Sequence, residues 1–287
     1  MIFSIIIPTY NRALLLDKCL QSLVKQTFKD FEVIVCDDGS TDNTKEITDK
    51  YINILNIKYI WEQNWGGPAR PRNRGISVTQ GEWICFLDSD DLFYPDKLKI
   101  LTNYLNDFDL IYHNLLINNN DDNNKKKKGS KSRQLNKKTF KNLMLRGNTI
   151  CNSSVCIRKD FLNRLGGLSE NKELIAVEDF DLWIRASLQN CRFKLIPKIL
   201  GEYWSGGGNI SSFGTLDVDR AANVYNQYIH LLSQKDSIKH KAFMAYSYGI
   251  AFQRENNKTA AIEKYKYALI YGELRIKLRS IYRILFS

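Results

Sequence analysis

The sequence predicts an α/β protein in which helices cover both faces of a mainly parallel sheet, followed by an α-helical C-terminal extension. Three observations lead to this prediction. Short apolar runs alternate with helical patterns over the first half of the chain, polar residues follow several of these runs, and the pattern after about residue 216 is helical throughout. Strands that alternate with helices pair in parallel, and ligands bind at the carboxyl ends of such strands.

Four short, continuously apolar runs are the expected strands of the first half, because strands buried on both faces lack polar alternation. A helix follows the first run: Asn11 stands where a cap is needed. Leu16, Leu20 and Leu23 lie on one face of that helix. Pro95 is expected as the first residue of another helix. The strands are expected at residues 3–7, 32–36, 57–61 and 83–87, and the other helices from about residue 42 and over residues 68–79.

The second half of the chain begins with a break in this pattern. Residues 118–132 consist of Asn, Asp and Lys apart from Gly129 and the serines, so they are expected to form a mobile surface loop with a solvated lysine run. Regular structure is expected again as a strand over residues 152–157, a helix over 177–185, and a strand that contains Tyr203 and Trp204.

Composition excludes several classes of protein. Hydrophobic residues make up 44% of the 287, and six dispersed cysteines without a CxxC pair argue against a disulfide framework or a zinc site. The start of the chain shows no secretory signal pattern, and no apolar run approaches the ~20 residues of a spanning helix. We therefore expect a cytoplasmic protein. Its net charge of +11 suits an anionic membrane surface, a phosphorylated substrate or nucleic acid.

Two aspartates one residue apart, Asp88 and Asp90, follow a short apolar run. Carboxylates this close repel one another unless a cation or a proton neutralises them, and their hard oxygens suit Mg²⁺ or Mn²⁺. The alternative is a strand that simply runs into an acidic turn, with Asp91 as a further turn residue. Asp37 and Asp38 also stand at a strand end, and this convergence favours a binding site.

Five motifs in register resemble the family-2 inverting glycosyltransferases, whose fold is called GT-A. They are Ser-Ile-Ile-Ile-Pro-Thr-Tyr-Asn-Arg at 4–12, Val-Ile-Val-Cys-Asp-Asp-Gly-Ser-Thr-Asp at 33–42, residues 64–75 ending in Arg-Asn-Arg-Gly, Phe-Leu-Asp-Ser-Asp-Asp at 86–91, and Glu-Asp at 178–179. The resemblance covers roughly residues 1–210. It implies a GT-A catalytic domain, which we expect over residues 1–212, and leaves a helical region over 213–287.

The resemblance implies a UDP-sugar donor and a divalent cation, Mn²⁺ or Mg²⁺. Asp38 would accept a hydrogen bond from the uracil. Asp90 would bind the metal directly, and Asp88 would contact the ribose or metal-bound water. A role in the turn alone stays open for one of Asp37 and Asp38. The residues implied to bind the nucleotide sugar are Pro8, Thr9, Tyr10, Asp38, Arg72, Asp88 and Ser89.

Asp179 matches the general base of the family, which takes the proton from the acceptor hydroxyl as that oxygen attacks C1 opposite to UDP. Glu178 would position it. The alternative is that both acids only favour a helix N-terminus electrostatically. Many relatives carry a histidine in the loop after the Tyr203 strand, whereas this chain has none there. The glycines of residues 206–208 indicate either a flexible lid or an ordinary loop.

The C-terminal region contains two further patterns. The residues with the spacing of one tetratricopeptide-like hairpin, used for core packing or peptide binding, are Gly249, Phe252, Ala261, Tyr265 and Ala268. The last helix is expected to carry Leu274, Leu278, Ile281 and Leu285 on one face, with Arg275, Arg279 and Arg283 on its flank. A basic amphipathic helix of this kind either binds an anionic membrane surface or docks on the protein core.

These expectations together describe a hexosyltransferase that moves glucose or galactose from UDP to a saccharide, lipid-linked by resemblance, in surface polysaccharide assembly such as O-antigen or capsule. It would work in the cytoplasm, peripherally on the inner face of the cell membrane, without nucleic acid. A rival is an aspartyl-phosphate phosphohydrolase, but that class carries its motif on an early strand, and three strands precede this one. A nucleic-acid-binding or scaffold protein would use the net charge but gives no reason for strand-end aspartates.

Overall fold

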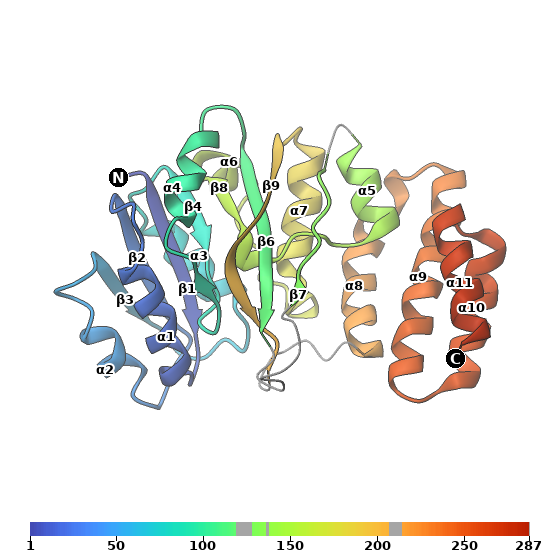
Figure 1. Cartoon of the computed structure of the whole chain (residues 1–287), viewed down its shortest axis with the longest axis horizontal. Helices are drawn as coiled ribbons and strands as arrows, with labels where there is room; N and C mark the ends of the chain where they lie inside the picture. The colour runs from blue at the N-terminus through green and yellow to red at the C-terminus, as the bar shows by residue number, and fades with distance from the viewer. Residues whose placement is uncertain (119–127, 136–137, 207–213, 287) are drawn as a thin grey trace. The chain divides into compact units, whose positions relative to one another are not determined.

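The computed structural model describes residues 1–118, 128–135, 138–206 and 214–286 (Figure 1). The chain divides into two compact units. Two short segments that precede residue 213 belong to the second unit, so the domain boundary expected there remains a prediction. The first unit comprises Met1–Lys137, Thr149–Glu170 and Glu178–Gly208, and the second comprises Lys138–Asn148, Asn171–Val177 and Asn209–Ser287.

The first unit is built around a sheet that has nine strands within the described residues. The strands are β1 (Phe3–Thr9), β2 (Phe31–Asp37), β3 (Ile57–Trp61), β4 (Trp83–Phe86), β5 (Leu92–Phe93), β6 (Leu110–Asn118), β7 (Lys128–Gly129), β8 (Cys156–Arg158) and β9 (Phe193–Trp204). Their order is β3-β2-β1-β4-β8-β6-β9-β5, with β7 paired to β6. The four strands expected in the first half of the chain are all present.

The sheet is parallel where the sequence is most regular and mixed elsewhere. The pairs β3–β2, β2–β1 and β1–β4 are parallel, as are β6 and β9. The short strand β8 runs antiparallel to both of its neighbours, β4 and β6, and β5 runs antiparallel to β9. The α/β class is confirmed, and its parallel part lies mainly in the first half of the chain.

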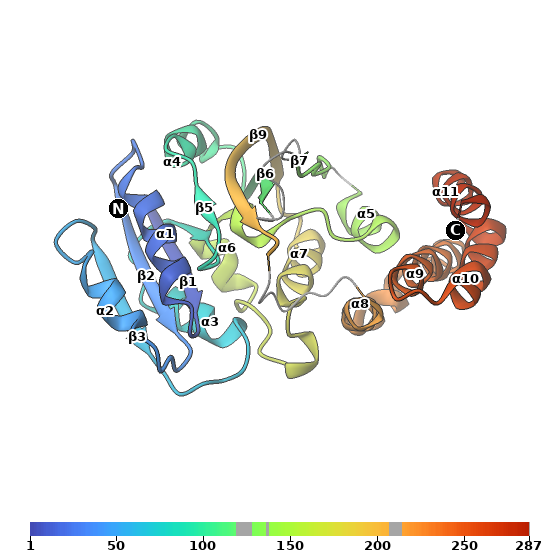
Figure 2. The same cartoon turned by 60° about the horizontal axis from the view of Figure 1, so that its bottom comes forward.

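Helices cover both faces of this sheet (Figures 1 and 2). On one face, Ile5 of β1 and Val33 of β2 are buried against Leu16 of the first helix, because alternate strand residues point the same way. On the other face, a Cβ on Gly75 would lie 2.6 Å from the sulfur of Cys36, so only glycine lets that helix approach. The helices are α1 (Ala13–Val24), α2 (Thr44–Asp49), α3 (Ala69–Ser77), α4 (Lys97–Leu101), α6 (Lys159–Arg164) and α7 (Glu178–Leu188).

The expectation that Asn11 caps α1 is wrong. Arg12 is the N-cap residue and makes no side-chain capping bond, while Asn11 adopts a left-handed φ of +50°. The Asn11 Oδ1 accepts the backbone N–H of Thr41 at 2.8 Å instead. In exchange, Asp42 Oδ2 accepts the N–H of Ala13 at 3.0 Å. The loops after β1 and β2 therefore bond to each other, and Asp42 accepts the first N–H of α1 in place of Asn11. These bonds depend on the two strand ends lying side by side.

Two other local expectations are shifted along the chain. Pro95 precedes the N-cap Asp96 and is not the first residue of α4, which begins at Lys97. Of residues 152–157, only the last two lie in a strand, because Asn152–Ser154 forms a 3₁₀ turn instead. This turn brings the Ser153 hydroxyl to the backbone N–H of Asp88 at 3.0 Å, which a continuous strand would not do.

The second unit is helical in its described residues. Its helices are α5 (Thr139–Arg146), α8 (Thr215–Tyr228), α9 (Gln234–Arg254), α10 (Lys258–Tyr271) and α11 (Leu274–Leu285). Gly249 of α9 packs directly against the ring of Tyr265 of α10. A Cβ at position 249 would lie 2.5 Å from that ring. Ala261 and Ala268 are fully buried in the same cluster, so the small and aromatic residues of the expected hairpin do fill its interior.

No helix in the described parts of the chain is long and apolar enough to cross a bilayer. Two expectations concern residues that the structure does not describe. The central part of the Asn- and Lys-rich loop, residues 119–127, and most of the glycine-rich loop after β9, residues 207–213, lie outside the described residues.

Candidate active site

The carboxyl ends of β1, β2 and β4 meet at one edge of the sheet. Thr9 stands opposite Asp37 in the register of β1 and β2, and Asp38 donates its backbone N–H to the Thr9 carbonyl at 2.9 Å. Asp88 and Asp90 follow β4, which pairs with the other side of β1. The strand-end aspartates therefore gather along this edge, as the sequence predicted.

A buried arginine, Arg72 of α3, joins two of the expected acidic positions. Its Nη2 donates to Asp88 Oδ1 at 2.5 Å, and its Nη1 donates to Glu178 Oε1 at 2.6 Å. Burial alone would lower the pKa of this guanidinium, but Asp88 and Glu178 outweigh burial and raise it. One guanidinium thus ties the turn after β4 to the N-terminus of α7, where Asp179 is the next residue.

Asp90 forms an ion pair with Arg12, whose Nη1 lies 2.5 Å from Asp90 Oδ2. Burial is the main reason that the pKa of the Asp90 carboxyl lies above its ordinary value, and the neighbouring Asp88 charge adds to it. The Arg12 charge acts in the opposite direction but does not restore the ordinary pKa. Burial and the Asp88 charge thus disfavour the ionised form of Asp90, and a bound cation would favour it.

The donor set fits a hard divalent cation that shares its coordination with a substrate. Within the described residues, no cluster of three or more His, Cys, Asp or Glu side chains could hold a metal by itself. Asp88 and Asp90 offer carboxylate oxygens only, and Mg²⁺ is commonly held by one or two carboxylates together with substrate phosphates and water. A cation at this pair would take its remaining ligands from a phosphate group and water.

Asp179 lies in the first turn of α7, and its Oδ1 accepts the N–H of Phe180 at 2.6 Å. Burial, followed by the adjacent Glu178 charge, raises the pKa of Asp179 to about 7, although Arg72 opposes the shift. Glu178 differs because its Oε1 is occupied by Arg72. Of the two neighbouring acids, Asp179 is therefore the one suited to accept and release a proton near neutral pH.

Asp37, the last residue of β2, and Asp38, the next residue, bind different groups. Asp38 accepts the N–H groups of Trp65 at 2.8 Å and Gly66 at 3.1 Å, so its carboxylate holds the loop after β3. Asp37 accepts the N–H of Ser40 at 2.7 Å and the hydroxyl of Tyr59 at 2.5 Å. Both side chains make structural hydrogen bonds, and the uracil contact of Asp38 stays a prediction.

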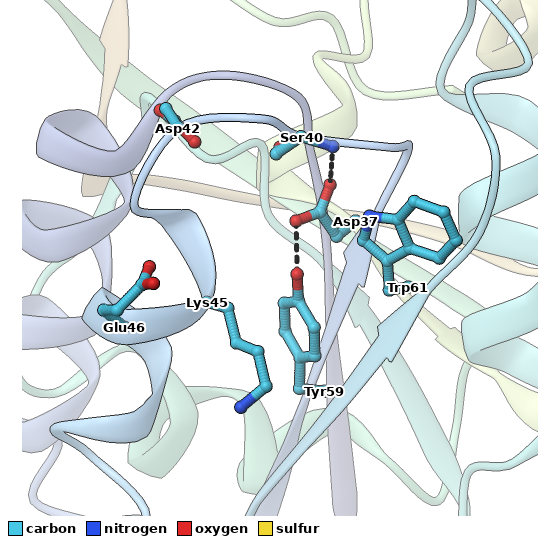
Figure 3. Close-up of a pocket in the computed structure, with 7 residues that line it drawn as sticks. All are labelled: Asp37, Ser40, Asp42, Lys45, Glu46, Tyr59 and Trp61. Atoms are coloured by element: carbon cyan, nitrogen blue, oxygen red, sulfur yellow. Dashed lines mark hydrogen bonds between the residues drawn. The ribbon is translucent and has the colours of Figure 1, made fainter.

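Asp37 also lines a pocket of about 480 Å³ between α2 and the edge strand β3. Figure 3 shows Asp37 bonded to Ser40 and Tyr59 there, with Trp61 and Lys45 beside them. The remaining lining residues are Asp42 and Glu46. None of the residues that the sequence analysis assigned to catalysis, nucleotide sugar or metal lines this pocket.

The other expected nucleotide-binding positions flank the same strand ends. Thr9 and Ser89 are buried, and Tyr10 is largely exposed at the end of β1. Pro8 stands opposite Cys36 inside the sheet, so its side chain is part of a buried strand. The structure thus places Tyr10 with an accessible side chain, whereas Pro8 and Ser89 are buried.

Sequence reasoning missed several residues that build the site. Arg12 was quoted in a motif but given no role, although a basic residue just after a strand end is a visible signal. The sequence suggests Asp91 only as part of the alternative acidic turn, yet it is buried and its Oδ1 accepts the N–H of Trp204 at 2.8 Å. This bond fixes the acidic turn to the end of β9. No local pattern could have revealed that partner.

A curated relative matches nearly the whole chain. It is the GalNAc(5)-diNAcBac-PP-undecaprenol beta-1,3-glucosyltransferase of Campylobacter jejuni, 28% identical over 99% of this chain and 87% of that protein. Several other curated relatives match only a segment, and that segment spans less than a fifth of their own length, 18–19%.

Two solved structures share the fold. Staphylococcus aureus TarS 1–349 in complex with UDP-GlcNAc has a TM-score of 0.63 and 23% identity, and the match covers 97% of this chain and 83% of that chain. Mannosyltransferase PcManGT from Pyrobaculum calidifontis, in complex with GDP-Man and Mn²⁺, has a TM-score of 0.62 and 17% identity, with 96% and 77% covered.

The comparison with protein-family models returns the family described as Glycosyl transferase family 2, whose model matches residues 4–166, more than half of the 287. The matched part contains β1 to β4, the aspartates at their ends, Arg12 and Arg72. The fold expected from the five sequence motifs is also the fold of the TarS structure. The chain belongs to glycosyl transferase family 2.

Proposed function

We propose that this chain is an inverting, metal-assisted glycosyltransferase that moves a hexose from a UDP-sugar to a saccharide acceptor during bacterial surface polysaccharide assembly. The observation that carries the proposal is Arg72, which contacts Asp88 and Glu178 at once. It holds the acidic turn that would face the diphosphate beside the acid, Asp179, that would face the acceptor. An inverting transfer needs these two groups on either side of the reacting carbon.

The relatives support the donor and acceptor classes. The TarS structure is a complex with UDP-GlcNAc, which favours a UDP-sugar here. The Campylobacter relative is a glucosyltransferase that acts on an undecaprenol-linked saccharide, which favours glucose and a lipid-linked acceptor. The PcManGT structure is a complex with GDP-Man and Mn²⁺, which supports Mn²⁺ or Mg²⁺ at the Asp88 and Asp90 pair.

In this mechanism Asp179 removes the proton of the acceptor hydroxyl. The hydroxyl oxygen forms a bond to C1 of the sugar as the bond from C1 to the UDP oxygen breaks. Arg72 pairs with Glu178 Oε1, and the raised pKa of Asp179 makes that carboxyl the proposed acceptor of the proton. Arg72 also orients Asp88, and Arg12 contacts Asp90. A divalent cation held by Asp90 and Asp88 would supply positive charge for the departing diphosphate.

Incubation with a panel of UDP-sugars, with UDP release measured in the presence and absence of lipid-linked saccharide, tests this function. We expect release with one hexose donor, increased by acceptor. Release of phosphate from aryl phosphates, without UDP release from any donor, would instead favour the phosphohydrolase. Binding of nucleic acid without either activity would favour the non-enzymatic alternative.

Asp38→Ala is expected to weaken UDP binding by about 10- to 150-fold, since a hydrogen bond to a charged group contributes about 1.5–3 kcal/mol. Metal binding should not change, because Asp38 contacts the loop at Trp65 and Gly66 and not the acidic turn. Calorimetric titration with UDP measures the effect. Tyr59→Phe is the matched control, since it removes a hydrogen bond to the neighbouring Asp37 only. Unchanged UDP affinity would leave Asp38 with its loop-holding role alone.

We further propose that α11 binds the anionic inner face of the cell membrane. The helix packs on its own unit through Ile276 and Ser280, which are 8% and 0% exposed. The apolar face expected from the sequence stays outside, with Leu274, Leu278 and Leu285 exposed by 73%, 58% and 70%. Arginines flank this face, so apolar burial and attraction to anionic lipid act together. One side of α11 therefore packs on its unit, while the opposite apolar side remains exposed.

A double substitution, Leu278→Asp with Leu285→Asp, should abolish flotation with anionic liposomes while leaving the melting temperature unchanged. Both side chains are exposed, whereas deletion of residues 274–287 would also remove the packed Ile276 and is the less selective test. High salt should weaken binding of the unaltered protein, because each basic residue near the surface contributes about 1 kcal/mol that salt screens. Leu231→Asp, at another exposed leucine of this unit, is the matched control. Full flotation of the double variant would refute the membrane role.

A further inference from the structure

Each carboxylate of the proposed metal pair already has its own arginine. Asp88 is paired with Arg72 and Asp90 with Arg12, both at 2.5 Å. The two arginines differ in mobility, because the Arg72 side chain is 4% exposed and also bound to Glu178, whereas the Arg12 side chain is 26% exposed. Of the two arginines, Arg12 is therefore the one whose side chain has access to solvent, although its partner Asp90 is only 8% exposed.

The backbone at Arg12 is held in place, so that the side chain is the part that can move. Asn11 donates its N–H to the Ser40 hydroxyl at 2.8 Å, which together with its Thr41 contact fixes the left-handed turn. The Arg12 carbonyl accepts the N–H of Leu16 at 2.9 Å in the first turn of α1. The backbone of Arg12 is thus fixed, and its guanidinium lies beside Asp90 at the end of a long side chain with several rotatable bonds.

We propose that Arg12 occupies Asp90 in the donor-free enzyme and exchanges this carboxylate for the diphosphate of the donor when a divalent cation takes Asp90. This inference rests on the proposed function. Arg12 would then compete with the metal for Asp90 when the donor is absent, and would bind the donor diphosphate when it is present. A guanidinium pairs with phosphate oxygens as it pairs with carboxylate oxygens, so the donor diphosphate can replace Asp90 as the partner of Arg12.

The exchange couples metal binding to donor binding. A cation that arrives alone must break the Arg12–Asp90 ion pair and leave the guanidinium without that anion. When the donor is present, its diphosphate replaces the lost partner. The metal should therefore bind more tightly with donor than without it, by a factor typical of coupled sites, about 5–150-fold. Linkage requires the donor to gain the same factor from the metal.

Arg12→Met tests the exchange through binding alone, without an activity assay. Mn²⁺ affinity is measured by electron paramagnetic resonance without nucleotide, and UDP affinity by calorimetry at saturating Mn²⁺. We expect the variant to bind Mn²⁺ alone more tightly and UDP–Mn²⁺ more weakly, so that the coupling factor falls to the part that direct coordination of the metal by the diphosphate supplies. Arg74→Met is the matched control, because Arg74 is an exposed arginine paired with Glu62 outside the site. It should leave both affinities and the coupling unchanged.

In Arg12→Met the Mn²⁺ affinity should rise and the UDP affinity should fall. These opposite changes distinguish the proposed exchange from a purely structural role of Arg12. Weaker binding of both Mn²⁺ and UDP in Arg12→Met, in equal measure, would overturn the inference while leaving the proposed function intact. Failure of the unaltered protein to bind either ligand would overturn both. If Arg12→Met does not fold, Arg12→Lys is used, which keeps one charge but loses the bidentate geometry. It should retain part of the coupling, because lysine keeps the charge but pairs with phosphate as a point charge, and full coupling in this variant would contradict an exchange that depends on the guanidinium.

Discussion

Asp179→Asn should lower the rate of sugar transfer by about 10²–10⁴-fold, the usual contribution of a positioned general base. Asparagine keeps the shape of the side chain but cannot accept the proton of the acceptor hydroxyl. UDP affinity should stay close to that of the unaltered protein, because Asp179 is proposed to face the acceptor. Single-turnover kinetics with bound donor, together with calorimetry for UDP, measure the two quantities separately.

The pH dependence of the rate provides a second measurement on the same residue. Burial and the Glu178 charge raise the pKa of Asp179 to about 7, so the carboxyl is protonated below that pH and ionised above it. Only the ionised form can act as a base. The rate should therefore fall about tenfold per unit of pH below 7 and level off above it. The Asp179→Asn variant should lack this dependence.

A matched control for Asp179 is Asp181→Asn in the same helical turn. Asp181 is buried and paired with Arg185 at 2.8 Å. Its replacement removes an acid from the N-terminus of α7 that is not proposed to contact the reacting groups. We expect a loss of stability and little change in the rate per folded enzyme. A normal turnover of bound donor by Asp179→Asn, combined with lost UDP affinity, would show that another group is the base.

Asp90→Asn should reduce transfer by at least 10²-fold, on the order of the loss seen when one electrostatic contact to a developing negative charge is removed. The amide lacks the charge that would hold a cation and also leaves Arg12 without its partner carboxylate. EDTA should have the same effect on the unaltered protein, and excess Mn²⁺ or Mg²⁺ should restore activity. Initial rates across a metal titration measure this.

The control is Asp96→Asn, an exposed acid six positions further along the chain, which should respond to chelator and metal as the unaltered protein does. Full activity in excess chelator would remove the metal role of Asp88 and Asp90 altogether. Loss of activity in Asp90→Asn without any change in metal affinity would place Asp90 among the structural residues of the turn.

The sequence by itself determined the strands of the first half, the buried face of α1 and the convergence of aspartates at strand ends. Residues 57–61 form β3 as expected, and Leu16, Leu20 and Leu23 are fully buried. These features follow from local periodicity, because a continuous apolar run or an apolar stripe at helical spacing can be buried in only one way. The apolar stripe of α11 has the same kind of spacing, but only the structure shows that it stays exposed while Ile276 and Ser280 are buried.

Only the tertiary structure decided which charged groups meet. Arg72 and Glu178 are 106 positions apart, and Arg12 and Asp90 are 78 apart. A guanidinium can satisfy any nearby carboxylate, so residue type and spacing do not specify its partner. The same reason explains the wrong cap at Asn11, whose amide is equally able to bond its own helix or the loop at Thr41. The choice depends on how closely β1 and β2 bring those loops together, and that distance is a property of the folded sheet.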